Sequence, residues 1–435
     1  MSEEKAPRLR GYGAVQGTCH AQRPRFEVAD VVRLYGDEYR REHSPSVAQE
    51  AVLRHIAECR TAALGGHIDE CEHGCGFTRI SYNSCGDRHC PKCQSLARAD
   101  WLDSRLERLL PVPYFHVVFT IPDDLNALAL GNKRLVFNIL FAAASDTLKT
   151  IARDSRSSGG RAKHLGAEVG FTAVLHTWGQ NILFHPHLHC VVTGGGLSPD
   201  GRRWVKARER FLLSVKVLGR LFRGKFLAAM KKARAEGQLR FHGSTLGLAD
   251  DVEWKHFLDG LYGKDWVVYA KPPFGGPELV FKYLGSYTHR VAISNHRIVD
   301  IHDSRVTFTL KDYKNGAART TMTVDAVEFL RRFLLHVLPR GFTRIRHYGL
   351  LAGCNVATKL DRARVLLAQS GAPTRPAIAM ADPDLPWWER LRDRTGIDLM
   401  ACPGCGGRLV RARVIEPVAK GLLATGTDHT VPDTS

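Results

Sequence analysis

The sequence predicts an α+β protein with a central antiparallel sheet flanked by helices, preceded by a small cysteine-rich module and followed by a helical region. Aromatic and β-branched residues fill 114–121, and two further runs, 169–178 and 186–193, are joined by a short connection, as in an antiparallel hairpin. Cysteine and histidine residues cluster between 59 and 93. With 435 residues, 44% apolar and 24% charged, the chain has the composition of a globular protein of two or three domains.

Five segments follow from changes in composition along the chain. They are an N-terminal arm, the cysteine-rich module, the main sheet domain, a C-terminal part of that domain and a tail, spanning residues 1–44, 45–110, 111–300, 301–355 and 356–435. The module ends in a helical stretch before Pro111, because proline interrupts a helix. The tail carries a Cys402-x2-Cys405 element, which is half of a zinc ribbon and has no partner pair nearby in the sequence.

Strands and helices alternate through the sheet domain. After the first strand we expect a largely helical stretch, the hairpin, a basic helical stretch to about Gly237, a helix that begins at Pro277, a second hairpin and a last helix. Apart from the basic stretch, these elements span residues 124–152, 169–193, 277–293, 297–312 and 324–338. Proline suits the first turn of a helix because the N–H that it lacks would have no partner there.

Positive charge is concentrated in one part of the chain. The formal net charge is +18, and residues 201–240 hold 13 Lys and Arg against Glu209 and Glu236. Such a patch attracts phosphate backbones without sequence specificity. A solvated helix surface is the alternative, and it is disfavoured because acidic partners at i,i+4 are mostly missing. The candidate DNA-binding residues of this patch are Arg202, Arg203, Lys206 and Arg208.

The sequence predicts a cytoplasmic protein that does not associate with a membrane. The N-terminus lacks the apolar core of a signal peptide, and the longest near-apolar stretch, Leu135–Ala144, is shorter than the roughly 20 residues of a membrane span. Thiols stay reduced in the cytosol. The clustered members of the 11 cysteines are therefore expected to be metal ligands rather than disulfides.

The strongest cluster of candidate ligands is His185-Pro-His187-Leu-His189. Alternate residues of a strand project to one face, so His187 and His189 can reach one ion. His176 lies eleven residues before His187, and this odd separation lets it pair across the hairpin onto the same face. His185 shares that parity and is the alternative third ligand. Because proline cannot donate to the sheet, Pro186 indicates a local edge or bulge.

A second group of candidate ligands predicts structural zinc. Zinc takes four cysteine or histidine ligands in a tetrahedron, and short paired spacings supply two at a time. Eight candidates lie close together in the sequence, enough for two ions. We expect one site at Cys71, Cys75, Cys90 and Cys93, and a possible second at Cys59, His67, Cys85 and His89, although the ligands can also be interleaved differently. For the tail pair, a distant residue such as Cys354 is a candidate partner.

Tyr283 and Tyr287 are candidate nucleophiles. Four residues of helix turn through about 400°, so both hydroxyls emerge on nearly the same face. Such a pair belongs more often to a core or an interface, but here Lys282, His289 and Arg290 supply positive charge, and Lys282 and Arg290 are candidate DNA-binding residues. Cations and a metal can activate a phenol whose ordinary pKa is about 10. Two phenols permit two successive strand breaks.

Five motifs, in order along residues 50–355, resemble the IS91-type (ISCR-like) two-tyrosine rolling-circle transposases of bacterial insertion sequences. These enzymes belong to the histidine-hydrophobic-histidine (HUH) nucleases, together with relaxases and replication initiators. The motifs are CRTAALGGH, YNSCGDRHCPKCQ, HPHLHCVVTGGG, YLGSYTHRVAISNHRI and RRFLLHVLPRGFTRIRHYGLLA, which begin at Cys59, Tyr82, His185, Tyr283 and Arg331.

The resemblance implies an HUH nuclease domain, a metal at His187 and His189, and nucleophiles at Tyr283 and Tyr287. Relaxases also use a histidine eleven residues before the pair, which favours His176. In small one-tyrosine transposases the third ligand follows the tyrosine by four residues, but that position after Tyr287 is a valine here.

The implied reaction uses single-stranded DNA at transposon ends. A tyrosine attacks a phosphodiester, forms a 5′-phosphotyrosine and releases a 3′-hydroxyl that primes synthesis by the host replication machinery, before the strand is joined to target DNA. Three imidazoles suit Mn²⁺, Zn²⁺ or Ni²⁺ better than Mg²⁺ by ligand softness. Because magnesium is abundant in cells, we expect Mg²⁺ or Mn²⁺ to support the activity.

Two alternatives remain at this stage. A relaxase or replication initiator would share the histidines and tyrosines and differ in its DNA substrate. A non-catalytic, zinc-dependent DNA-binding regulator would need the cysteines and the basic patch, but no metal at His187 and His189.

Overall fold

The fold is that of a computed structural model. It describes residues 24–93, 101–102, 105–153, 165–208, 215–271, 285, 291–312, 316, 318–371 and 385–418.

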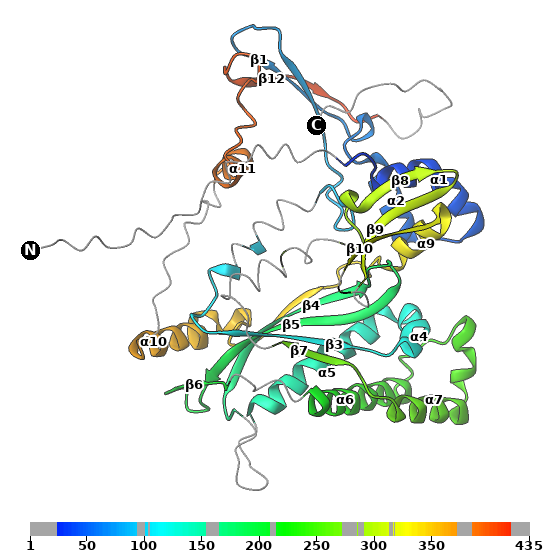
Figure 1. Ribbon diagram of the computed structural model, residues 1–435, viewed down its shortest axis with the longest axis vertical. Helices are drawn as coiled ribbons and strands as arrows, with labels where there is room; N and C mark the ends of the chain where they lie inside the picture. Colours follow the sequence, from blue (N-terminus) through cyan, green and yellow to red (C-terminus); the bar gives the residue numbers. More distant parts are fainter. Residues whose placement is uncertain are drawn as a thin grey trace, which may run out of the picture.

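A six-stranded antiparallel sheet forms the centre of the molecule (Figure 1). Its main path runs β11-β4-β5-β3-β7, and β6 pairs with the far end of β5. The strands are β3 (Tyr114–Thr120), β4 (Glu168–Trp178), β5 (Phe184–Leu197), β6 (Trp204–Lys206), β7 (Val268–Lys271) and β11 (Ile345–Gly349). This sheet and the helices on it confirm the predicted α+β class and the β4–β5 hairpin. Strand β11 comes from the C-terminal part of the predicted domain.

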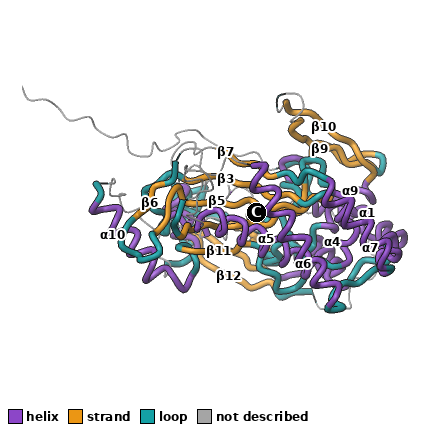
Figure 2. Tube along the Cα trace, turned by 90° about the horizontal axis from the view of Figure 1, so that it is seen from below, coloured by secondary structure: helices purple, strands orange, loops and turns teal. Residues whose placement is uncertain are grey.

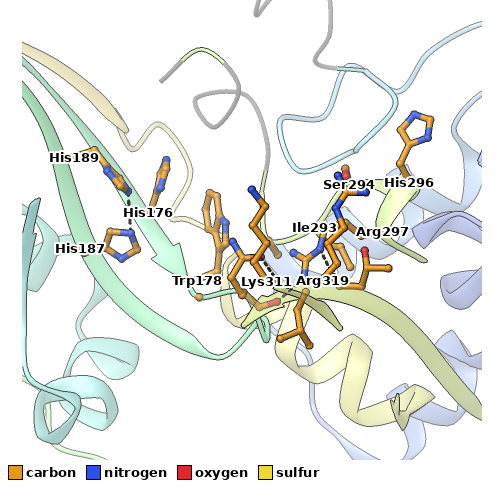
Figure 3. A pocket seen from close by; sticks show the side chains of 15 residues that line it. His176, Trp178, His187, His189, Ile293, Ser294, His296, Arg297, Lys311 and Arg319 are labelled. Carbon is orange, nitrogen blue, oxygen red and sulfur yellow. Dashed lines mark hydrogen bonds between the residues drawn. The ribbon is translucent and has the colours of Figure 1, made fainter. Parts of the chain in front are cut away.

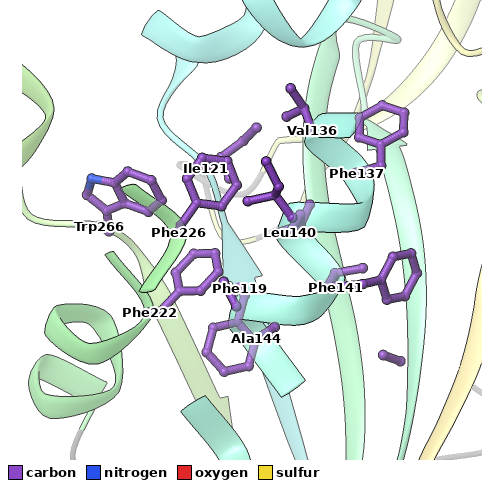
Figure 4. Packing of buried hydrophobic residues seen from close by; sticks show 14 of the residues in the cluster. Phe119, Ile121, Val136, Phe137, Leu140, Phe141, Ala144, Phe222, Phe226 and Trp266 are labelled. Carbon is purple, nitrogen blue, oxygen red and sulfur yellow. The ribbon is translucent and has the colours of Figure 1, made fainter. Parts of the chain in front are cut away.

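Helices cover one face of this sheet and build the main core. They are α4 (Asn126–Gly131), α5 (Lys133–Arg153), α6 (Val215–Ala235) and α7 (Asp251–Gly263). Phe119 of β3 packs against Phe222 of α6, with ring centroids 5.0 Å apart, and Phe222 in turn meets Trp266 (Figure 4). Each large apolar side chain buried here contributes about 1.5–3 kcal/mol. The basic segment is helical over α6, whose apolar residues face this core.

Side chains at the start of β5 point alternately into the apolar core and toward the opposite face of the sheet. Leu188 and Cys190 are fully buried among the helices, whereas His187 and His189 point to the other face and are partly exposed. Strand periodicity thus keeps the imidazoles out of the apolar core.

Helix α5 is the one helix among the described residues that is long and apolar enough to cross a membrane, but 67% of its apolar window is buried inside the protein. Its apolar surface is therefore accounted for by the core.

A second core joins residues 28–59 to residues 291–337. Helices α1 (Val28–Glu42) and α2 (Val47–Glu58) pack with α9 (Ala326–Leu335) and with a three-stranded antiparallel sheet of β8 (Ile298–His302), β9 (Arg305–Asp312) and β10 (Ala318–Asp325). The described part of the predicted arm is therefore a packed helix. The predicted second hairpin and last helix are confirmed as β8–β9 and α9. Figure 2 shows β9 and β10 projecting beside α9.

The described part of the tail contains two helices and a strand. After α10 (Asp361–Gln369) and α11 (Trp387–Thr395), strand β12 (Leu409–Ile415) pairs with β1 (Gly66–Cys71), which in turn pairs with β2 (Thr78–Tyr82). The end of the described chain thus joins the cysteine-rich module. Short 3₁₀ turns at Ala62–Leu64, Asp123–Leu125, Gly243–Ala249, Asn295–Arg297 and Gly353–Asn355 and a π turn at Val356–Leu360 complete the elements.

The helix predicted at 277–293 lies almost entirely outside the described residues. Gly285 within it is helical, but Val291–Ile293 are described and are not helical. Ala292 has a φ of 58°, in the left-handed region that ends helices, so the predicted end at Ile293 is wrong by at least three residues.

Candidate metal centre and its cleft

Three histidines on β4 and β5 converge on one point. His176 lies directly opposite His187 in the strand register, as their odd separation predicted, and His189 is the next residue on that face. One ring nitrogen of each lies within 4.8 Å of the others, and the Nε2 atoms of His187 and His189 are 3.1 Å apart. Two nitrogens at right angles around an ion with bonds of about 2.1 Å are about 3.0 Å apart. The spacing therefore fits a bound metal.

Neighbouring acceptors orient these rings. The carbonyl oxygen of His185 lies 2.7 Å from Nδ1 of His187, and because a carbonyl only accepts, Nδ1 carries the proton and donates. Nε2 of His187 is left with its lone pair toward the site. His189 meets His116 through a 2.9 Å contact from Nδ1 to Nε2 of His116. That contact turns Nε2 of His189 toward the same site.

The histidines of the site are neutral near pH 7. Loss of hydration lowers the pKa of His187 to about 4 and holds the pKa values of His176 and His189 well below the ordinary value of 6.5. Burial also lowers the pKa of His116 to about 4. Neutral imidazole is the form that binds metal ions, so no proton has to leave before a metal binds.

His185, the alternative third ligand, lies outside this group. Its side chain is 42% exposed, and Nδ1 is 3.3 Å from a carboxylate oxygen of Asp123. The strand register explains the difference. Between the pairs His176–His187 and Trp178–Phe184, β5 holds one residue more than β4, which is the bulge that Pro186 predicted.

Sequence reasoning did not identify His116. It lies on β3, whose Val118 pairs directly with His189, so His116 is two residues away on the same face. The sequence of residues 114–121 shows which side chains share a face of the strand. It does not show how β3 is aligned against β5, and that register brings His116 to His189.

The histidines open into a cleft of about 580 Å³ (Figure 3). Trp178 stacks on His176 with ring centroids 4.8 Å apart, and the cleft continues from it to Lys311 and Arg319. These two cations are exposed and face each other directly across β9 and β10. Like charges at directly opposite positions destabilise a sheet. Two cations at the cleft that holds the histidines are suited to an anionic ligand, whose charge would offset their repulsion.

Arg297, the third Lys or Arg residue of the cleft wall, has a structural role. Arg297 donates from Nε to the carbonyl of Thr309 at 2.7 Å, and from Nη2 to the carbonyl of Gln180. It thereby joins the small sheet to the turn between β4 and β5.

The DNA-binding residues predicted from the basic patch lie elsewhere. Arg202, Arg203, Lys206 and Arg208 are exposed on and around β6, which pairs with Gly195–Leu197. Gly195 is six residues along β5 from His189, or about 20 Å at about 3.3 Å per residue. The other candidates, Lys282, Arg290, Tyr283 and Tyr287, lie outside the described residues.

Eight of the cysteines form two groups of four, and these groups differ from the two predicted zinc sites. The first comprises Cys59, Cys85, Cys90 and Cys93, and the second comprises Cys71, Cys75, Cys402 and Cys405. Cys90 and Cys93 therefore do not join Cys71 and Cys75. The physical reason is the β1–β2 hairpin, which carries Cys71 and Cys75 at its tip. After the hairpin, the carbonyl of Asn83 accepts a hydrogen bond from the N–H of Arg60, and this contact brings Cys85 beside Cys59.

The two histidines predicted as zinc ligands have other partners. Nδ1 of His89 is 2.9 Å from a carboxylate oxygen of Asp87, and its Nε2 accepts from the backbone N–H of Leu338. Nε2 of His67 is 3.5 Å from a carboxylate oxygen of Asp69. Neither histidine belongs to either of the two four-cysteine groups. Cys354, the candidate partner for the tail pair, is exposed and stands outside both groups.

Comparisons with known proteins fit this arrangement. Residues 31–121 match a family model described as "Transposase zinc-binding domain", and residues 170–359 match one described as "Putative transposase". "Putative transposase y4qJ" of Sinorhizobium fredii (strain NBRC 101917 / NGR234) is 50% identical over 394 residues, which are 90% of this chain and 96% of that protein. "Transposase for insertion sequence element IS801" of Pseudomonas savastanoi pv. phaseolicola is 26% identical over 381 residues, covering 84% and 83%.

Among solved structures, the conjugative relaxase TrwC in complex with oriT DNA matches with 16% identity and a TM-score of 0.23. The match covers 40% of this chain and 68% of the relaxase chain.

Proposed function

The chain belongs to the IS91-type family of transposases, and from that premise we propose that it cleaves and rejoins single-stranded DNA at the ends of its insertion sequence. The proposed reaction is rolling-circle transposition through 5′-phosphotyrosine intermediates. The observation that carries this proposal is the cleft in which three neutral imidazoles face the opposed cations Lys311 and Arg319.

His176, His187 and His189 would hold one divalent cation, and Mg²⁺ or Mn²⁺ is the proposed metal. Such an ion, when bound, polarises a phosphate oxygen and favours attack at phosphorus. The protein itself supplies the geometry: the carbonyl of His185 and the ring of His116 orient two of the three ligands. Trp178 offers an aromatic face on which a base can stack.

Tyr283 and Tyr287 are the proposed nucleophiles. The phenol oxygen of one forms a bond to phosphorus, the bond from phosphorus to the 3′ oxygen breaks, and the phenol proton passes to that leaving oxygen. The products are a 5′-phosphotyrosine and a free 3′-hydroxyl that primes host replication. Because the covalent link conserves the energy of the phosphodiester, the second tyrosine can transfer the strand to target DNA without ATP.

The length of chain after the tyrosines supports this assignment. Tyr287 precedes Val291 by four residues, and Ala292 and Ile293 line the cleft. Four residues extend no further than about 14 Å. Only a short length of chain therefore separates Tyr287 from the residues of the cleft wall in the sequence.

We also propose that Cys59, Cys85, Cys90 and Cys93 bind one structural Zn²⁺. The sulfurs of Cys59 and Cys93 are 3.3 Å apart, and those of Cys85 and Cys93 are 3.6 Å apart. A closed site of four sulfurs leaves no open position for chemistry. Its role is then to fix the chain after α2. A cytoplasmic location accords with reduced cysteines.

The first test is formation of a covalent adduct. The full chain is incubated with Mn²⁺ and single strands copied from the DNA that flanks its gene. A strand labelled at its 3′ end should leave its labelled fragment attached to the protein on a denaturing gel, because the fragment downstream of the cut is linked through its 5′ phosphate. Strands from a plasmid origin serve as the comparison, since a replication initiator would prefer them. DNA binding that is lost with chelator, together with no adduct on any strand, would favour the non-catalytic regulator.

Reversing the charges of the cleft should weaken DNA binding. Lys311→Glu with Arg319→Glu removes two phosphate contacts, so affinity for single strands should fall roughly 10- to 100-fold at 0.1 M salt, and the slope of log K against log salt should fall by about 0.7 per contact. The fold is expected to be unchanged, because two glutamates repel across the strands as the two cations do. Fluorescence anisotropy at several salt concentrations measures both quantities.

The matched control is Arg202→Glu with Arg203→Glu, which changes the net charge equally on exposed residues near β6. If this control lowers the affinity as much as the cleft variant does, the cleft is not the primary binding surface.

A further inference from the structure

The tail pair Cys402 and Cys405 meets Cys71 and Cys75 in space, although more than 320 residues separate the pairs in sequence. The sulfurs of Cys71 and Cys405 are 3.3 Å apart, and those of Cys75 and Cys402 are 3.6 Å apart. Four sulfurs around zinc at about 2.3 Å lie about 3.8 Å from one another, whereas sulfurs in a disulfide are about 2.05 Å apart. The spacing is therefore that of a metal site, not of a disulfide.

Both pairs lie in turns suited to zinc ligation. The N–H of Gly74 donates to the carbonyl of Cys71 at 3.0 Å, and the N–H of Gly406 donates to the carbonyl of Cys402 at 2.9 Å. Gly406 has a φ of 75°, which glycine adopts without strain. The two turns also touch each other, because a Cβ on Gly407 would lie 2.6 Å from Nδ1 of His73.

The backbone extends this junction into a sheet. β12 pairs with β1 over Gly66–Cys71, the N–H of Arg408 donates to a carboxylate oxygen of Glu72 at 2.9 Å, and Nη1 of Arg79 donates to the carbonyl of Leu399. At the other end, a Cβ on Gly65 would lie 2.5 Å from the carbonyl oxygen of Ile415. The tail strand is thus seated along the whole of β1.

Apolar burial is too small to hold this sheet. Its core among the described residues comprises Cys71, Cys402 and Leu409, with Phe77 packed against them, and most of β12 is exposed. A module of this size ordinarily needs a metal or a disulfide in place of a larger core.

We infer that Cys71, Cys75, Cys402 and Cys405 bind a second structural Zn²⁺, which makes residues 409–415 a strand of the N-terminal zinc module. The proposal goes beyond the proposed function and does not depend on it. The tail pair lies outside both segments that match family models, residues 31–121 and 170–359.

The test counts zinc bound to the full chain by native mass spectrometry. Cys402→Ser with Cys405→Ser should lose one ion relative to the unaltered chain, and so should Cys71→Ser with Cys75→Ser. The quadruple variant should also lose only one, because both pairs hold the same ion. Cys354→Ser, an exposed cysteine outside the groups, is the matched control and should lose none.

Three results would overturn the inference: no loss from the tail variant, loss of two ions from the quadruple variant, or two fewer free thiols in the unreduced chain, which indicates a disulfide. Zinc retained at the first group shows that the variant chain has folded.

Hydrogen exchange gives a second measurement of the same site. In the Cys71→Ser, Cys75→Ser variant, protection of residues 409–415 should be lost, although the substitutions are more than 330 residues away, while β4 and β5 stay protected. Unchanged protection at 409–415 would contradict the inference. Failure of this site and failure of covalent adduct formation are measured separately, so neither result decides the other.

Discussion

Replacing both candidate nucleophiles, by Tyr283→Phe with Tyr287→Phe, should abolish the covalent DNA adduct while leaving the affinity for single strands within about twofold. Phenylalanine keeps the ring and removes only the hydroxyl, so the bond to phosphorus cannot form. Loss of a nucleophile lowers rates by orders of magnitude, and we expect a drop of at least about 10³-fold in adduct formation. A labelled strand on a denaturing gel measures adducts, and fluorescence anisotropy measures binding.

The single variants separate the roles of the two phenols. If each tyrosine cleaves one strand end, each single variant should still form an adduct but should fail to complete strand transfer. Tyr269→Phe is the matched control, because Tyr269 is an exposed tyrosine on β7. An adduct that persists at the original level in the double variant would show that the nucleophile lies elsewhere in the chain.

The histidine group could be predicted because its geometry is local. Strand alternation relates His187 to His189, and a short hairpin relates both to His176, so the sequence separations alone determine the face. The bulge at Pro186 followed from the same reasoning, since a proline lacks the N–H that the sheet requires.

The remaining parts of the site depend on contacts between distant segments. The register of β3 against β5 brings His116 to His189, and the position of the small sheet brings Lys311 to the cleft. The predicted grouping of the cysteines differs from the grouping in the structure, because closely spaced cysteines were expected to share an ion. The β1–β2 hairpin instead separates them, and the partners of Cys71 come from the end of the chain.

Substitution of the histidines should lower the affinity for Mn²⁺ most at the proposed ligands and less at a residue that only orients a ligand. His187→Ala with His189→Ala removes two of three ligands, so binding of Mn²⁺ and adduct formation should both fall below detection. His116→Phe removes only the partner of Nδ1 of His189. Loss of such an orienting contact typically costs 10- to 100-fold in metal affinity. Titration calorimetry with Mn²⁺ measures the affinity directly.

The dependence of cleavage on metal concentration distinguishes a ligand from a positioning residue. In His116→Phe, saturating Mn²⁺ should restore most of the cleavage rate, because all three ligands remain, and His116→Gln should recover part of the affinity through its amide oxygen. The double alanine variant should not respond to added metal. His185→Ala is the comparison within the same motif, and it should change the affinity little because its ring is turned toward Asp123. If His185→Ala lowers the affinity for Mn²⁺ much more than His176→Ala does, the ligand assignment is wrong, and the third ligand is His185.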